Sequence, residues 1–163
     1  MGFVRGWVGG LLGGFDIDCA VDAHSVTGRI GGMMRGADVN LSISGDEIEG
    51  RLGGAFHGQS VYACMVGLEL GGRIGGELVG RDIALKQIGE EVTGRVGGEY
   101  LGFSCALQQV NGHLGGRLGG QFAGHDVNAK VEDCPPLLAA LLVVLTYHYY
   151  VFTRRSPPAA ANP

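Results

Sequence analysis

The sequence lacks an excess of basic residues, and this argues against a nucleic-acid partner. Its 163 residues include 12 Lys and Arg against 16 Asp and Glu, which gives a net charge of −4. Phosphate binding requires clustered Lys and Arg in excess, so we expect no nucleic-acid partner. A phosphate-binding GxxxxGK[ST] loop and a strand-to-helix glycine fingerprint for dinucleotides are also absent from the sequence.

Residues that would carry catalysis or a metal site are equally scarce. The four cysteines show no metal-ligand spacing, and the histidines are scattered along the chain. The phrase GGxxxGxD, for example from Gly31 to Asp38, does not have the spacing of the calcium-binding nonapeptide GGxGxDxUx. No nucleophile, base and orienting group can be identified together. We therefore predict a protein that is not an enzyme and that has no metal or cofactor.

Glycine, by contrast, is abundant, and its abundance excludes several fold classes. The chain has 32 glycines, and 45% of its residues are apolar. Each glycine inside a helix costs about 1 kcal/mol relative to alanine, which excludes a conventional helical bundle. Disorder is excluded because the apolar content is too high and the net charge too low. Collagen is excluded because glycine does not fall at every third position. A β structure punctuated by glycine remains.

The glycines belong to a repeat of 22 residues. Its signature is the phrase GRxGG, which begins at Gly28, Gly50, Gly72, Gly94 and Gly116. One period earlier the phrase begins at Gly6, with Trp7 in the place of Arg, so the chain has six units. A further glycine follows eight residues after the first glycine of each unit, and no glycine occurs after residue 133. Residues 1–133 are therefore predicted to form one repeat domain.

Apolar and polar residues alternate within each unit, as they do in a strand with one buried face. Val39, Leu41 and Ile43, for example, alternate with polar residues. Each unit therefore predicts two short strands separated by glycine bends. The alternation changes phase near Gln87 and Gln109, where we expect a bulge.

The invariant period predicts an all-β solenoid in which each 22-residue unit is one rung. Equivalent residues of parallel rungs stack about 4.8 Å apart, and such stacking demands a period without insertions. The arginines of the GRxGG phrase are a difficulty for this fold, because like charges at strand spacing repel one another.

A twelve-stranded antiparallel meander, closed into a barrel, is the alternative. Gly36-Ala37 and Gly45-Asp46 fit type II′ hairpin turns, and Asn111-Gly112 fits a type I′ turn. Turns at these positions keep one face apolar, with Ile43 opposite Ile48. They also shift the pairing by about four residues per unit, and closure at a shear of about 24 requires a strand tilt well above the usual 35–45°. The solenoid is therefore ranked first.

The chain becomes hydrophobic after residue 133. The segment Pro135–Phe152 carries no formal charge, and as a helix it would cover about 27 Å, close to the thickness of a bilayer core. Tyrosines near its end and Arg154-Arg155 after it resemble interfacial anchors. We predict a transmembrane helix over residues 134–153 and a disordered tail over residues 154–163. The alternative is a helix that caps an open end of the β body or is buried in a partner.

The predicted helix makes membrane lipid an expected partner. Its anchoring side chains are Leu137, Leu138, Leu141, Leu142, Val143, Val144, Leu145, Tyr147, Tyr149, Tyr150 and Phe152. The apolar residues 7–15 keep phase with the repeat and are interpreted as its first unit, not as a signal peptide. We therefore expect a single-pass protein with a C-terminal anchor, whose body lies in the cytosol or an equivalent compartment.

The arginines of the GRxGG phrase, which we name the Arg column, are the candidate interaction site. They are Arg29, Arg51, Arg73, Arg95 and Arg117. Their long stems can cover the pleated surface while the charged heads stay in water. They can also form a basic stripe that meets acidic residues of a partner or anionic lipid head groups.

These observations together predict a non-catalytic, membrane-anchored scaffold. Its expected partners are other subunits of a membrane assembly, for which it would be an accessory subunit, or further copies of itself in a self-associating β-solenoid. The alternative function is that of a membrane-embedded β-barrel with a pore or transport role.

Overall fold

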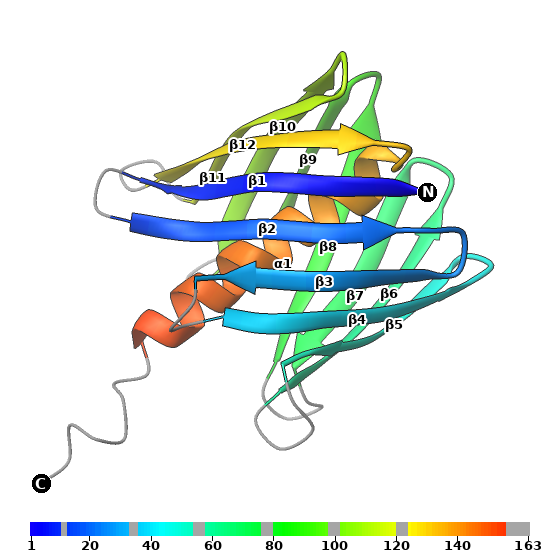
Figure 1. Cartoon of the computed structure of the whole chain (residues 1–163). Helices are drawn as coiled ribbons and strands as arrows, with labels where there is room; N and C mark the ends of the chain where they lie inside the picture. Colours follow the sequence, from blue (N-terminus) through cyan, green and yellow to red (C-terminus); the bar gives the residue numbers. More distant parts are fainter. Residues whose placement is uncertain are drawn as a thin grey trace, which may run out of the picture.

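The chain forms a closed barrel of twelve strands with one helix inside it (Figure 1). The computed structural model describes residues 1–10, 13–32, 36–53, 58–75, 80–97, 102–119 and 124–155, with side chains as far as Val151. The strands are β1 (Gly2–Gly10), β2 (Gly13–Val21), β3 (Ser25–Gly31), β4 (Gly36–Ser44), β5 (Glu47–Leu52), β6 (Gln59–Val66), β7 (Glu69–Gly75), β8 (Gly80–Ile88), β9 (Glu91–Val96), β10 (Phe103–Val110), β11 (His113–Gly119) and β12 (Gly124–Glu132). The helix α1 (Pro136–Arg155) follows β12.

Each strand pairs in antiparallel fashion with its neighbours in the sequence, and β12 pairs with β1 to close the barrel. The prediction of a parallel solenoid is therefore wrong, and the antiparallel alternative is confirmed. The reason lies in turns such as Gly45-Asp46 and Gly67-Leu68, whose glycines adopt φ values of 61° and 62°. Two-residue turns of this kind join antiparallel neighbours, whereas parallel strands need a long crossover.

The register of the hairpins removes the objection to closure. Gly31 pairs with Gly36, so the predicted turn at Gly36-Ala37 is wrong and these two residues belong to β4. Leu41 pairs with Val26 on one side and Gly50 on the other, which aligns residues 24 positions apart where the repeat is 22. This stagger of two residues per unit accumulates to about twelve around the barrel, which corresponds to a strand tilt of about 35°. A tilt of this size lies within the usual range for barrels.

The predicted bulges at Gln87 and Gln109 are also wrong. Gln87 pairs with Val92, and the next pair, Ile88 with Glu91, continues the same register. The pairs at Gln109 and Val110 likewise continue to the turn. The change of phase in the sequence has another cause, since an apolar residue simply occupies an outward position in each strand: Ile88 is 64% exposed and Val110 38% exposed.

The walls of the barrel are apolar on the inside and polar on the outside. On β4, for example, Val39 and Leu41 are buried, whereas Asp38 and Asn40 on either side of Val39 are exposed. The same alternation of buried and exposed side chains runs along β2, β8, β10 and β12. The inner faces of the twelve strands thus present one continuous apolar surface to the lumen.

The helix α1 fills this lumen. Leu141 and Val143 at its centre have no exposed surface, and the helix contacts strands from opposite parts of the wall (Figure 1). Nine of the predicted anchor residues are buried, Tyr149 is partly buried, and the side chain of Phe152 lies outside the described part. Within the described residues, no helix is long and apolar enough to cross a membrane. The prediction of a transmembrane helix is therefore not supported, because the wall of the barrel itself covers the apolar surface of α1.

The first glycine of the GRxGG phrase permits a close approach between neighbouring strands. A Cβ atom at Gly72 on β7 would lie against the carbonyl oxygen of Tyr62 and 2.8 Å from Cα of Ala63, both on β6. At Gly50 a Cβ atom would meet the carbonyl oxygen of Asn40 and lie 2.7 Å from Cα of Leu41. The backbone of the next strand therefore occupies the space that a side chain would need, which accounts for this column of glycines.

Candidate functional site

The Arg column lies on the outer face, on alternate strands from β3 to β11. Each arginine stands opposite the residue nine positions later on the next strand. The interactions are Arg29 Nη1 with Asp38 Oδ1 at 3.1 Å, Arg51 Nη1 with Ser60 Oγ at 3.2 Å, Arg73 Nη1 with Asp82 Oδ1 at 2.7 Å, Arg95 Nη1 with Ser104 Oγ at 2.9 Å, and Arg117 Nε with Asp126 Oδ1 at 3.8 Å. Successive arginines are thus two strands, or about 10 Å, apart with an acceptor between them, so like charges do not stack at strand spacing.

The arginines also cover the glycine that follows eight residues after the first glycine of each unit. A Cβ atom at Gly36 would lie 2.9 Å from Nη2 of Arg29, and one at Gly124 would lie 2.7 Å from Nη2 of Arg117. In the first unit a Cβ atom at Gly14 would lie 2.8 Å from Cε2 of Trp7. A flat guanidinium and a flat indole thus occupy the same place above a glycine, which explains why Trp replaces Arg in this column.

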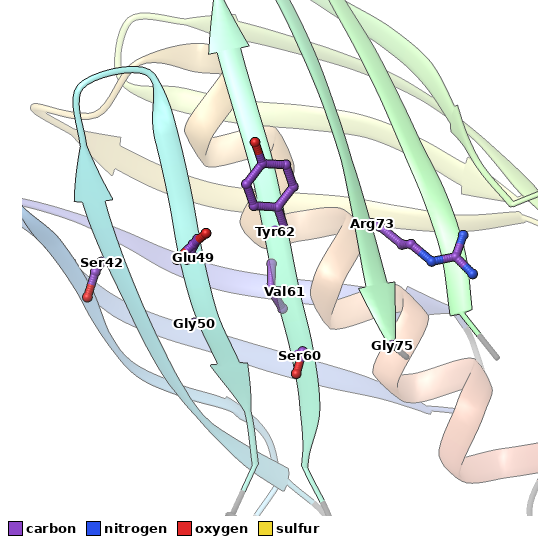
Figure 2. A pocket seen from close by; sticks show the side chains of 8 residues that line it. All are labelled: Ser42, Glu49, Gly50, Ser60, Val61, Tyr62, Arg73 and Gly75. Atoms are coloured by element: carbon purple, nitrogen blue, oxygen red, sulfur yellow. The ribbon is translucent and has the colours of Figure 1, made fainter. Parts of the chain in front are cut away.

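A groove of about 760 Å³ crosses the outer face of β4 to β7 (Figure 2). Its lining residues are Ser42, Glu49, Gly50, Ser60, Val61, Tyr62, Arg73 and Gly75. Four of them form one row across the sheet, because Glu49 pairs with both Ser42 and Tyr62, and Tyr62 pairs with Arg73. Tyr62 therefore lies in the middle of the groove, with a carboxylate on one flank and a guanidinium on the other.

The groove coincides with a departure from the repeat. The positions equivalent to Tyr62 in the other units hold Asp18, Asn40, Ala84, Ala106 and Asn128. The positions equivalent to Glu49 hold Arg5, Thr27, Gly71, Thr93 and Gly115. The combination of an aromatic ring and a neighbouring carboxylate thus belongs to one unit alone. The sequence analysis missed this site, although an aromatic residue in a column of small and polar residues was a visible signal.

The surroundings of Tyr62 are acidic on the side of β5. Its hydroxyl donates a hydrogen bond to Oε1 of Glu47 at 3.4 Å. The negative charge of Glu47, first of all, raises the pKa of Tyr62, and Glu49 adds to the effect. On the other flank the charge of Arg73 is engaged by Asp82. The ring therefore lies in a region of negative potential.

A second group of polar and aromatic side chains surrounds the C-terminal half of α1 inside the barrel. His148 Nε2 lies 2.9 Å from Oε1 of Gln59 on β6, and the hydroxyl of Tyr149 donates to the carbonyl oxygen of Gly36 at 3.1 Å. The rings of Tyr147 and Phe103 meet edge to face with centroids 4.5 Å apart. These contacts fix the helix against the wall and leave the group in a structural role.

The buried His148 predicts a loss of stability in mild acid. Burial, and to a smaller extent the charge of Arg81, lowers its pKa from 6.5 to about 4. Below pH 6.5 the unfolded chain binds a proton that the folded chain does not, so stability falls as the pH drops from 6.5 toward 4, by about 3 kcal/mol in total. Urea unfolding at pH 7 and pH 5 measures this slope. His148→Asn should abolish it and the exposed His113→Asn should not; an unchanged slope in His148→Asn contradicts the prediction.

The cysteines divide into three buried thiols and one at the outer face. Cys19, Cys105 and Cys134 are buried, and burial raises the pKa of each to about 12. Cys64 is partly exposed on β6. In the part of the chain that the structure describes, no three His, Cys, Asp or Glu side chains are placed to hold a metal ion.

Comparison with known proteins gives no relative from which a function could be taken: no family model, no curated protein and no solved structure matches the chain. Function is therefore inferred from the geometry of the described residues.

Proposed function

We propose that this protein is a non-catalytic scaffold, a barrel closed by its own helix that binds its partners on the outer face. The observation that carries the proposal is α1 in the lumen, with Leu141, Leu142 and Val143 at most 1% exposed. Wide barrels commonly enclose a ligand or an aqueous channel. Here apolar side chains of the helix occupy that volume, so the outer face is the surface that remains for recognition.

The polarity of the wall favours this function over a pore. The outer face carries the Arg column together with its Asp and Ser partners. A barrel with lipid around it has the reverse pattern, apolar outside and polar inside. A transport role would also require α1 to leave the lumen and expose both its own apolar surface and that of the wall. Partners that fit the proposal are other subunits of an assembly or further copies of this chain.

Thiol protection tests whether the helix stays in the barrel. With full-length protein and Ellman's reagent, we expect Cys64 to react rapidly and Cys19, Cys105 and Cys134 to react only after unfolding, because buried thiols are inert. The same pattern is expected with vesicles of phosphatidylcholine and phosphatidylserine present. Exposure of Cys105 and Cys134 by vesicles would overturn the proposal in favour of a helix that moves into lipid.

A further inference from the structure

The outward side chains of β6 form an apolar stripe that starts in the groove. Tyr62, Cys64 and Val66 point outward in succession, and Leu68 continues the stripe in the turn to β7. Tyr62 is 42% exposed, Val66 62% and Leu68 57%. An aromatic ring and two aliphatic side chains are thus presented to solvent along one strand.

Carboxylates border this stripe on both sides. Glu47 pairs with Cys64 and Glu49 pairs with Tyr62 on the side of β5, while Glu69 pairs with Val66 on the side of β7. The three glutamates are exposed at the surface. The nearest arginines have partners within the barrel, since Arg73 pairs with Asp82 and Arg51 donates to Ser60. The border of the stripe is therefore acidic toward the Gly67-Leu68 turn.

Tyr62 is held in place before any partner arrives. Its hydroxyl bond to Glu47 fixes one end of the ring, while the small side chains of the groove leave its surroundings open (Figure 2). A ring that is already oriented loses little conformational freedom on binding. The face of a tyrosine ring attracts a cation within about 6 Å of its centroid, and neighbouring carboxylates strengthen that attraction.

We infer that the β6 stripe and its acidic border, which we name the β6 surface, bind a basic segment of a partner protein. A Lys or Arg side chain of that segment lies over the ring of Tyr62 and pairs with Glu47 or Glu49. An apolar side chain of the same segment covers Val66 and Leu68, because exposed apolar residues with a polar border are typical of protein interaction sites. This inference rests on the proposed scaffold function and specifies the chemistry of its partner.

A peptide titration of the full-length chain tests the inference. The probe is acetyl-Arg-Leu-Arg-Leu-Arg-amide, followed by amide chemical shifts in solution NMR at low and at moderate salt. We expect shifts confined to β5, β6 and β7, and binding that weakens as salt is added. The matched peptide acetyl-Gln-Leu-Gln-Leu-Gln-amide is expected not to bind.

Variants assign the contacts within the β6 surface. Tyr62→Leu should weaken the arginine peptide about fivefold and Tyr62→Phe less than twofold, because only the first removes the ring. The double variant E47Q/E49Q should weaken it about tenfold. Glu91→Gln, an exposed glutamate on β9, is the control and should have no effect.

Three results would overturn the inference: equal binding of the glutamine peptide, shifts centred on other strands, or equal binding by Tyr62→Leu. Binding of methyl glucoside with the same shifts, in place of the arginine peptide, would assign the surface to a sugar. None of these outcomes changes the thiol protection of Cys105 and Cys134, so failure of the β6 surface and failure of the scaffold proposal are distinguishable.

Discussion

Replacing Leu141 with Asp will remove the cooperative unfolding transition of the whole barrel, although Leu141 belongs to the helix and not to the wall. Its side chain has no exposed surface and lies at the centre of the apolar lumen. A carboxylate there has no partner and must be buried or must expel the helix, and either outcome costs several kcal/mol of a stability that is rarely above 15 kcal/mol. The milder Leu141→Ala should leave a cooperative transition and lower the free energy of unfolding by about 3 kcal/mol.

Leu68→Asp is the matched control, because Leu68 is a leucine at the surface of the β6–β7 turn. Its free energy of unfolding in urea should stay within about 0.5 kcal/mol of the parent value. Circular dichroism at the strand minimum follows the wall in each variant. Unfolding of the wall in Leu141→Asp at the same urea concentration as in the parent would show that helix and wall are independent, and would return α1 to the status of a separate anchor.

The placement of the helix could not be read from its own residues. Lipid and the lumen of an apolar barrel are equally apolar surroundings, so a hydrophobic stretch such as Leu137–Leu145 predicts burial without saying where. The combination of helix and wall was more informative. Side chains fill a barrel of about eight strands, whereas twelve strands enclose more volume than they can fill. A twelve-stranded barrel with apolar inner faces therefore requires an apolar occupant, and the tail supplies it.

The strands were predictable from the sequence, but their register was not. The period, the six units and the boundary after the repeat follow from glycine positions alone. The choice between parallel and antiparallel pairing depended on where each turn lies. Moving one connection from Gly36-Ala37 to the residues before Gly36 reduced the shear from about 24 to about twelve and made closure possible. An error of a few residues thus reversed the ranking of the two folds.

The candidate site was predictable only in part. The Arg column follows from the repeat, yet its acceptors, Asp or Ser nine positions later, become visible only when the hairpin register is known. The groove around Tyr62 depends on three strands brought together by that register. Its one signal in the sequence was the departure of Tyr62 and Glu49 from their columns.

Two adjacent glycines on β7 give the sharpest test of the wall. Gly72→Ala should lower the free energy of unfolding by about 3 kcal/mol, because the new Cβ atom meets backbone atoms of β6, including Cα of Ala63 at 2.8 Å. The backbone of a paired strand cannot rotate away as a side chain can. Relief therefore requires the β6–β7 pair to separate, and the closed barrel opposes that movement through each of its neighbouring pairs.

Gly71→Ala is the control for the same strand and the same chemical change. No atom lies within 4 Å of a Cβ atom at Gly71, and the residue is exposed. We expect this variant to be as stable as the parent or up to about 1 kcal/mol more stable, because alanine restricts the unfolded chain more than glycine does. Urea unfolding of the two variants side by side measures the difference. Equal stability would mean that the wall can open locally at β6–β7, and that close approach does not explain why glycine recurs every 22 residues at this position.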